Sequence, residues 1–250
     1  MRIKKFLLLA HLFLLFFLMI AAFRPSIFYW VLLIANIILF FISYRIVKLK
    51  PGSGFLKYLI LPILFVNACF FYGSLLASKF LFILILFFSV LLLFYYYRSA
   101  IKYCFIESDR RKNLPFWSNL FGFLTVFLSS SFLYGLPYFI NISVWLILSI
   151  LLIVLFVPFF HNLSVEKKTI QTDLFFSFFF LFSIFPLLWA LLLMPFNYNV
   201  LGLLVSLFYY SSLNFTVFYL NKELTVKKLR YNLIFISLFL LLVLLSAKWK

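Results

Sequence analysis

The residues that could act as acids, bases, nucleophiles or metal ligands are few in this chain. It has five acidic residues, two histidines and two cysteines among 250 residues. The histidines, His11 and His161, lie far apart, and the cysteines, Cys69 and Cys104, form no Cys-x-x-Cys pair. None of these residues has the spacing typical of a metal site. The sequence therefore predicts no metal and no cofactor.

Nucleotide chemistry has no sequence support either. The chain has only six glycines, and Gly52-Ser53-Gly54 after Pro51 is typical of a flexible turn. No stretch resembles the glycine-rich Lys-Ser/Thr loop that binds nucleotide phosphates. A serine nucleophile would need a base, and neither histidine is placed for that role by a motif. We therefore expect a protein that is not an enzyme and does not hydrolyse ATP itself.

The elements that position these groups are strongly apolar. The chain is 67% hydrophobic and 24% aromatic, whereas soluble domains are about half apolar. Too few polar side chains exist to cover a water-facing surface. The net charge of +17 would indicate nucleic-acid binding in a soluble protein. Here basic residues at the cytoplasmic ends of membrane helices explain it, so no nucleic-acid partner is expected.

Long apolar segments set the expected fold. A spanning helix needs about 20 mostly apolar residues. Prolines and polar residues divide the chain at Ser78-Lys79, at Gly135-Leu136-Pro137 and at 195–199. We predict an all-α bundle in one integral membrane domain over residues 1–250, with no soluble domain. Its nine spanning helices are 6–23, 27–47, 57–77, 80–97, 116–135, 139–160, 173–194, 198–220 and 231–247.

The basic residues predict the orientation. With the N-terminus inside and the helices alternating, all Lys and Arg fall in inside segments except four: Arg24, Lys79, Lys248 and Lys250. Cytoplasmic loops carry such an excess of basic residues. The C-terminus is then outside. One alternative concerns the first segment, since a basic start before an apolar run also resembles a secretory signal peptide. Its candidate cleavage end, Ile20-Ala21-Ala22, has a bulky residue where a small one is preferred.

The acidic residues exclude two classes of membrane protein. All five lie in predicted inside loops or at a helix end: Glu107, Asp109, Glu166, Asp173 and Glu223. Ion-coupled pumps usually hold carboxylates near the middle of the membrane, and an intramembrane aspartyl protease needs paired carboxylates there. Neither class is expected.

Uncharged polar residues remain inside the predicted helices. Asn67, Ser74 and Ser129, together with His11, form a candidate polar intramembrane cluster. One interpretation is helix packing, because small residues allow close approach and Asn or Ser donates between helices. The other interpretation is a polar pathway or pocket, opened by kinks at Pro62 and Pro186. Both interpretations stay open at this point.

Basic residues on the inside face form a candidate docking surface for anionic lipid or a protein partner. They are Arg110, Arg111, Lys112, Lys227 and Lys228. The longest connection, residues 98–115, mixes apolar and basic residues. It is compatible with an interfacial helix on anionic lipid and equally with a solvated loop.

A resemblance supports a bacterial origin. Residues 131–136, Val144-Trp145-Leu146, the stretch PFNYNVLGLL at 195–204 and the terminal Leu-Ser-Ala-Lys-Trp resemble uncharacterised multi-pass membrane proteins of candidate-phylum bacteria. The resemblance implies a location in the bacterial cytoplasmic membrane. It implies no activity and no site residue.

Three functions are compatible with these features. The first is a non-enzymatic structural, assembly or complex subunit, which the missing catalytic groups favour. The second is a permease for a small neutral or lipid-like solute, driven by a separate ATPase; the repeated Leu-Phe-Tyr-Tyr at 93–96 and 207–210 fits the internal repeats of transporters. The third is an enzyme on lipid-linked substrates that uses Glu107, Asp109 or Glu166 at the membrane surface.

Overall fold

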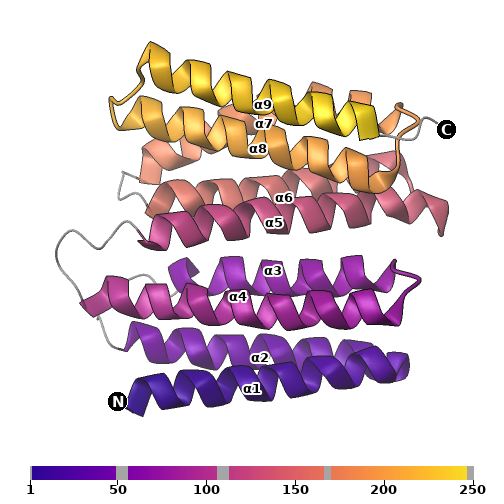
Figure 1. The fold of residues 1–250 in the computed structure, drawn as a ribbon, viewed down its shortest axis with the longest axis vertical. Helices are drawn as coiled ribbons and strands as arrows, with labels where there is room; N and C mark the ends of the chain where they lie inside the picture. The colour runs from indigo at the N-terminus through magenta and orange to yellow at the C-terminus, as the bar shows by residue number, and fades with distance from the viewer. Residues whose placement is uncertain (1, 49–55, 106–112, 166–169, 247–250) are drawn as a thin grey trace. The chain divides into compact units, whose positions relative to one another are not determined.

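The fold is helical throughout the part of the chain that the structure describes. The structure is a computed structural model that describes residues 2–48, 56–105, 113–165 and 170–246. These ranges contain nine α-helices, two short 3₁₀ helices and no strand (Figure 1). The α-helices are α1 (Arg2–Phe23), α2 (Phe28–Val47), α3 (Leu56–Ser74), α4 (Lys79–Phe105), α5 (Asn113–Gly135), α6 (Val144–Val165), α7 (Ile170–Leu192), α8 (Tyr198–Leu220) and α9 (Val226–Ser246). The all-α prediction is confirmed.

The helices form two compact units, Met1–Phe121 and Gly122–Lys250, and the boundary falls inside α5. In the first unit, α1 packs on α2 and α4, and α3 packs on the same two helices. Its core is apolar, with Leu18 of α1, Leu39 of α2, Phe70 of α3 and Leu93 of α4 all fully buried. Large apolar side chains stabilise a fold most when they are fully buried and closely packed, as these four are.

The second unit is built around α6 and α8. Helix α6 packs on α7 and α8, α7 packs on α8, and α9 packs on α8. Phe159 of α6 stacks on Phe180 of α7, with ring centroids 4.1 Å apart. Gly202 of α8 lies so close to Ser131 of α5 that a Cβ at Gly202 would come within 2.7 Å of the Ser131 backbone nitrogen. Small residues such as Gly202 allow membrane helices to approach this closely.

Six of the described helical segments are long and apolar enough to cross a membrane. They are Phe28–Val47, Lys79–Tyr103, Leu114–Tyr138, Val144–Val165, Ile170–Leu192 and Tyr198–Leu220. Shorter apolar stretches occupy Lys5–Ala21 of α1 and Tyr58–Ser74 of α3. Many large apolar side chains on these helices remain exposed, among them Phe182 and Trp30. Exposed apolar surface on this scale indicates an integral membrane protein.

Several helix ends differ from the sequence prediction. Helix α3 ends at Ser74 and not at residue 77, and the turn before Lys79 includes Ser78, whose Oγ accepts from the Leu81 N–H at 3.4 Å. Helix α4 continues to Phe105, α6 begins at Val144, and α9 begins at Val226. Hydropathy marks the apolar middle of a helix, but backbone hydrogen bonding continues through polar residues until a cap or a proline ends it.

Candidate functional site

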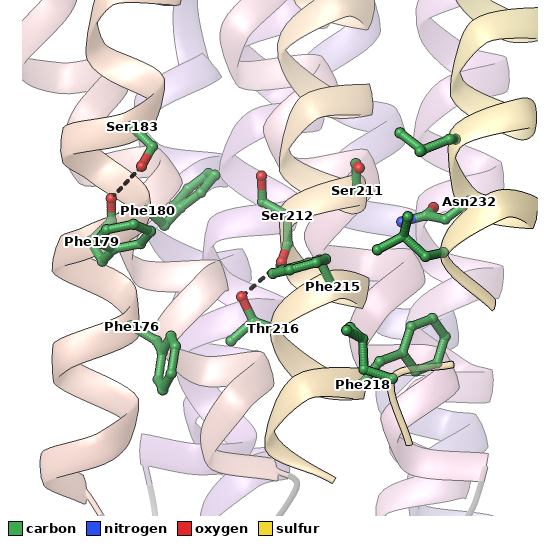
Figure 2. A pocket seen from close by; sticks show the side chains of 13 residues that line it. Phe176, Phe179, Phe180, Ser183, Ser211, Ser212, Phe215, Thr216, Phe218 and Asn232 are labelled. Carbon is green, nitrogen blue, oxygen red and sulfur yellow. Dashed lines mark hydrogen bonds between the residues drawn. The ribbon is translucent and has the colours of Figure 1, made fainter. Parts of the chain in front are cut away.

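The candidate site is a groove in the second unit, formed by α7, α8 and α9 (Figure 2). It is open to the surroundings and has a volume of about 290 Å³. Helix α8 forms its floor, and α7 and α9 form its two walls (Figure 2). Phenylalanines make up much of the lining, from Phe176 and Phe179 on α7 to Phe215 and Phe218 on α8. None of the described lining residues is charged.

Two of the hydroxyl groups in the groove are satisfied within their own helices. Ser183 Oγ donates to the Phe179 carbonyl at 2.9 Å, and Thr216 Oγ1 donates to the Ser212 carbonyl at 2.8 Å (Figure 2). Both are bonds from a side chain to the carbonyl four residues earlier, a common arrangement for Ser and Thr in membrane helices. These hydroxyls have little capacity left to donate to a ligand.

Three further polar side chains of the groove remain able to donate and accept hydrogen bonds. The side chains of Ser211, Ser212 and Asn232 line the groove, and within the described ranges none of them has a side-chain hydrogen-bond partner. Figure 2 shows Asn232 pointing from α9 toward α8. A serine hydroxyl and a carboxamide can each donate and accept. The groove thus combines apolar walls with uncharged polar groups, and it is complementary to an uncharged, hydrogen-bonding molecule with an apolar body.

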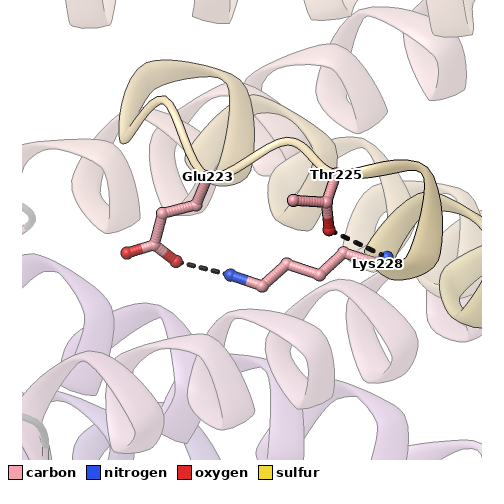
Figure 3. A network of polar contacts seen from close by, with 3 residues as sticks. All are labelled: Glu223, Thr225 and Lys228. Carbon is pink, nitrogen blue, oxygen red and sulfur yellow. Dashed lines mark hydrogen bonds and ion pairs between the residues drawn. The ribbon is translucent and has the colours of Figure 1, made fainter.

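A tight turn lies at one end of the groove. Helix α8 ends in a Schellman motif: Lys222 has a φ of 55°, its N–H donates to the Tyr219 carbonyl at 3.1 Å, and the Glu223 N–H donates to the Phe218 carbonyl at 3.0 Å. Thr225 then caps α9, because its Oγ1 accepts from the Lys228 N–H at 3.3 Å (Figure 3). The turn fixes the start of α9 beside the end of α8.

The charges at this end are partly neutralised. Lys228 Nζ lies 2.6 Å from Glu223 Oε2 (Figure 3) and 5.0 Å from the centre of the Phe218 ring, which lines the groove. A second open groove of about 270 Å³ adjoins the first and shares Phe218 and Asn232 with it. Lys228 lines that second groove. The side chain of Asn232 is therefore accessible from both grooves.

The residues of the predicted polar intramembrane cluster have separate surroundings. His11 is buried between α1 and α4, with Nδ1 2.7 Å from the Leu7 carbonyl and its ring edge-on to Phe94. Asn67 accepts a hydrogen bond from Asn36 Nδ2 at 3.2 Å, which joins α3 to α2. This interhelical amide pair is the packing role that membrane asparagines commonly have.

The two serines of that cluster also differ from each other. Ser74 is exposed at the end of α3 and donates to the Phe71 carbonyl at 2.6 Å. Ser129 is half-buried on α5 in the second unit. Pro62 is buried in α3, and Pro186 is exposed in α7, one turn beyond Ser183. A shared pathway through these residues stays a prediction.

The predicted docking surface is described only in part. Arg110, Arg111 and Lys112 lie outside the described residues, as do Glu107, Asp109 and Glu166. Lys227 is exposed, with Nζ 6.0 Å from the centre of the Tyr231 ring. Lys228 is half-exposed and paired with Glu223. Lipid or protein docking at these residues, and surface chemistry by the acids, stay predictions.

Sequence reasoning missed the groove residues and one buried polar pair. Ser211, Ser212 and Asn232 interrupt apolar runs, and this interruption was the available signal. Asn162 Nδ2 donates to the Tyr209 hydroxyl at 2.9 Å, deep between α6 and α8, and Gly122 lies against both side chains.

Comparison of the chain with protein-family models, with curated proteins and with solved structures finds no match. The function therefore has to be inferred from the geometry.

Proposed function

We propose that the chain is an integral protein of a bacterial cytoplasmic membrane that binds a small neutral or lipid-like solute in the α7–α8–α9 groove and moves it as a permease. In this proposal all nine helices span the membrane, the N-terminus is inside and the C-terminus is outside. The observation that carries the proposal is the combination of phenylalanine walls with the polar side chains of Ser211, Ser212 and Asn232, which have no hydrogen-bond partner among the described residues. No chemical conversion of the solute is part of the proposal.

The depth of the polar groups supports a membrane-borne solute. Ser211 lies nine residues before the end of α8 at Leu220, or roughly 14 Å along the helix axis. Half of the hydrocarbon thickness is about 15 Å. In the proposed orientation these polar side chains lie near the middle of the bilayer, where lipid tails offer no hydrogen bonds. A solute that brings a hydroxyl, ester or amide group to this depth satisfies them.

The direction of the groove supports a permease. It extends from Leu224, beside the turn after α8, to Ser183 and Ser211. In the proposed orientation it therefore connects the inner surface with the middle of the membrane. Transporters place the substrate site near the midplane and open it to one side at a time. The described groove corresponds to an inward-open state of that cycle.

Retention of the solute tests the proposal. The protein is purified from native membranes in mild detergent, and the co-purified small molecules are identified by mass spectrometry. We expect an enriched neutral amphiphile, and a loss of roughly tenfold in Asn232→Leu or in Ser211→Ala/Ser212→Ala, since each neutral hydrogen bond contributes about 0.5–1.5 kcal/mol. Ser149→Ala is the matched control, because Ser149 of α6 is exposed outside the groove and donates to Trp145.

Two results would contradict the proposal. The first is an enriched molecule that is charged, since the described lining offers no counter-charge. The second is equal retention in the groove variants and in the Ser149 variant. A stoichiometric ATPase in the same preparation supports energised transport, whereas transport by the chain reconstituted alone in vesicles supports passive movement of the solute.

A complex subunit is the second candidate, and the surface of α9 favours it. Helix α9 packs on α8, yet its described side chains include exposed apolar groups along its length, from Val226 and Tyr231 to Leu238 and Leu241. Such a face is available to another membrane helix as well as to lipid. A tagged chain that recovers a fixed-ratio membrane partner, and loses it on Leu238→Asn substitution, would favour the subunit role over the permease.

A further inference from the structure

Another groove, with a different chemical character, lies in the first unit between α1, α2 and α4. Its volume is about 320 Å³, within the range of roughly 300–1,000 Å³ that small-molecule sites occupy. Unlike the described lining of the α7–α8–α9 groove, the lining of this groove includes charged residues. The lining consists of Phe6, Leu7, Ile42, Arg45, Ile46, Lys48 and Ile101.

The floor and the rim of this groove differ in chemistry. Leu7, Ile42 and Ile46 are buried at the base of the groove, and the half-buried Phe6 and Ile101 give its floor accessible apolar surface. Arg45 and Lys48 are exposed and lie in and just after the last turn of α2. The site is therefore amphipathic, with aliphatic groups below and two cations at its edge.

The two cations have aromatic neighbours but no anionic partner within the described part of the chain. The Arg45 guanidinium carbon lies 4.5 Å from the centre of the Phe6 ring, and Lys48 Nζ lies 4.8 Å from the centre of the Tyr44 ring. Because Phe6 lines the groove, its contact holds Arg45 there. Contacts with ring faces leave the N–H groups of both cations able to donate. The acids of the first unit, Glu107 and Asp109, lie outside the described residues.

We propose that this groove binds an anionic phospholipid, with an acyl chain against Phe6 and Ile101 and the phosphate on Arg45 and Lys48. A guanidinium holds a phosphate through two parallel hydrogen bonds, and an ammonium adds a point charge. Basic pockets between membrane helices at the cytoplasmic side bind anionic lipid headgroups in this way. The inner leaflet follows from the proposed orientation, whereas the lipid chemistry follows from the groove alone.

The apolar floor distinguishes a lipid from a free anion. An inorganic or soluble organic phosphate would use only the rim and would leave the accessible apolar surface of Phe6 and Ile101 in contact with water. A phospholipid covers both parts of the site. The proposal is also independent of the solute groove, which belongs to the other unit and has no charged residue in its described lining.

Lipid-selective binding tests the proposal. The delipidated protein in detergent is titrated with phosphatidylglycerol, with phosphatidylcholine of the same chains and with glycerol 3-phosphate, and bound lipid is counted by native mass spectrometry. We expect phosphatidylglycerol to bind best. The double variant Arg45→Gln/Lys48→Gln should bind it roughly tenfold to thirtyfold more weakly, since each basic residue near a membrane surface contributes about 1 kcal/mol. Helix content and elution volume confirm that the variant is folded.

A matched variant makes the test specific to the site. Lys5→Gln/Lys102→Gln removes two exposed cations from α1 and α4 that do not line the groove, so it should keep full binding. An equal loss in both double variants would mean attraction by net charge alone and would overturn the proposal. Equal binding of phosphatidylcholine, or displacement of the lipid by glycerol 3-phosphate, would overturn it too. Ile101→Trp provides a second check, because filling the groove should lower lipid binding with both cations in place.

Discussion

At the residue scale, polar side chains inside this protein have two different roles: some pair with each other between helices, and others line a groove. Asn162 and Tyr209 satisfy each other between α6 and α8, and Asn36 pairs with Asn67 between α2 and α3. Ser211, Ser212 and Asn232 have no such partner within the described ranges and face an open groove. Residue type does not distinguish the two roles, because an asparagine has the same donors and acceptors in both. The groups that neighbouring helices place beside a polar side chain determine which role it has.

The Asn162–Tyr209 pair gives a direct stability prediction. Tyr209→Phe keeps the ring edge-on to Phe159 and Phe180 and removes the acceptor of the Asn162 amide. Membrane hydrogen bonds between helices contribute about 0.6 kcal/mol on average and up to about 1.7 kcal/mol. We expect a loss of about 1 kcal/mol in the free energy of unfolding, measured by denaturant titration in detergent. Tyr198→Phe is the control, since that hydroxyl lies at the start of α8, and an equal loss there would argue against a specific role for the pair.

The glycines give a second prediction at this scale. A Cβ at Gly202 would meet the backbone of Ser131, at 2.7 Å from its nitrogen and 2.9 Å from its Cα. A Cβ at Gly73 would meet the ring of Phe82, which can rotate. Gly202→Ala should therefore destabilise the protein by about 1–3 kcal/mol, as overpacking does, and Gly73→Ala should destabilise it less. Thermal unfolding of the two variants in the same detergent compares them, and the reverse order would contradict the close approach of α5 and α8.

At the element scale, the turn from α8 to α9 determines the shape of the solute groove. Lys222 has a positive φ at the position where Schellman motifs usually have glycine. A left-handed conformation costs a residue with a Cβ about 1–2 kcal/mol. The Glu223–Lys228 ion pair contributes little to stability, because both side chains are well exposed, at 58% and 41%. Backbone geometry and the Thr225 cap therefore fix this turn.

Two separate substitutions to glycine test whether the backbone conformation of Lys222 matters for the turn. Lys222→Gly should stabilise the protein by about 0.5–1 kcal/mol, because glycine adopts the left-handed conformation without the steric cost. Lys227→Gly removes the same charge from the first turn of α9, which has helical backbone, and should destabilise by up to about 1 kcal/mol. Hydrogen exchange at the α9 amides provides the readout. If both variants shift exchange in the same direction, the conformation of Lys222 is not the cause.

At the scale of the whole molecule, six described helices are long and apolar enough to cross a membrane, and the proposed topology needs three more, α1, α3 and α9. A reporter that is active only in the periplasm tests this count. Fused after Asn197, Glu223 or Lys250, it should be active, silent and active, respectively. Activity after Glu223 would reverse the orientation of α8 and place the mouth of the solute groove on the outside.

The amino-acid sequence by itself determined the fold class and the approximate position of each of the nine helices. It could do so because a helix in lipid needs a long apolar run, and prolines and polar residues interrupt such runs. It also placed the acidic residues away from the helix centres, and Asp173 does lie in the first turn of α7. These features depend on local composition alone.

Only the tertiary structure decided which polar side chains pair and which face a groove. Asn67 was grouped with Ser74, and the sequence left open whether the two residues pack helices or line a pathway; the hydrogen bond of Asn67 is to Asn36, 31 positions away in the sequence. Asn232, Arg45 and Lys48 became site candidates only when α7 and α8 lay beside α9, and α1 beside α2 and α4. The physical reason is that phenylalanine and leucine occur on every face of these helices. Hydrophobic periodicity therefore does not encode which face is packed, and the fit of neighbouring side chains selects it.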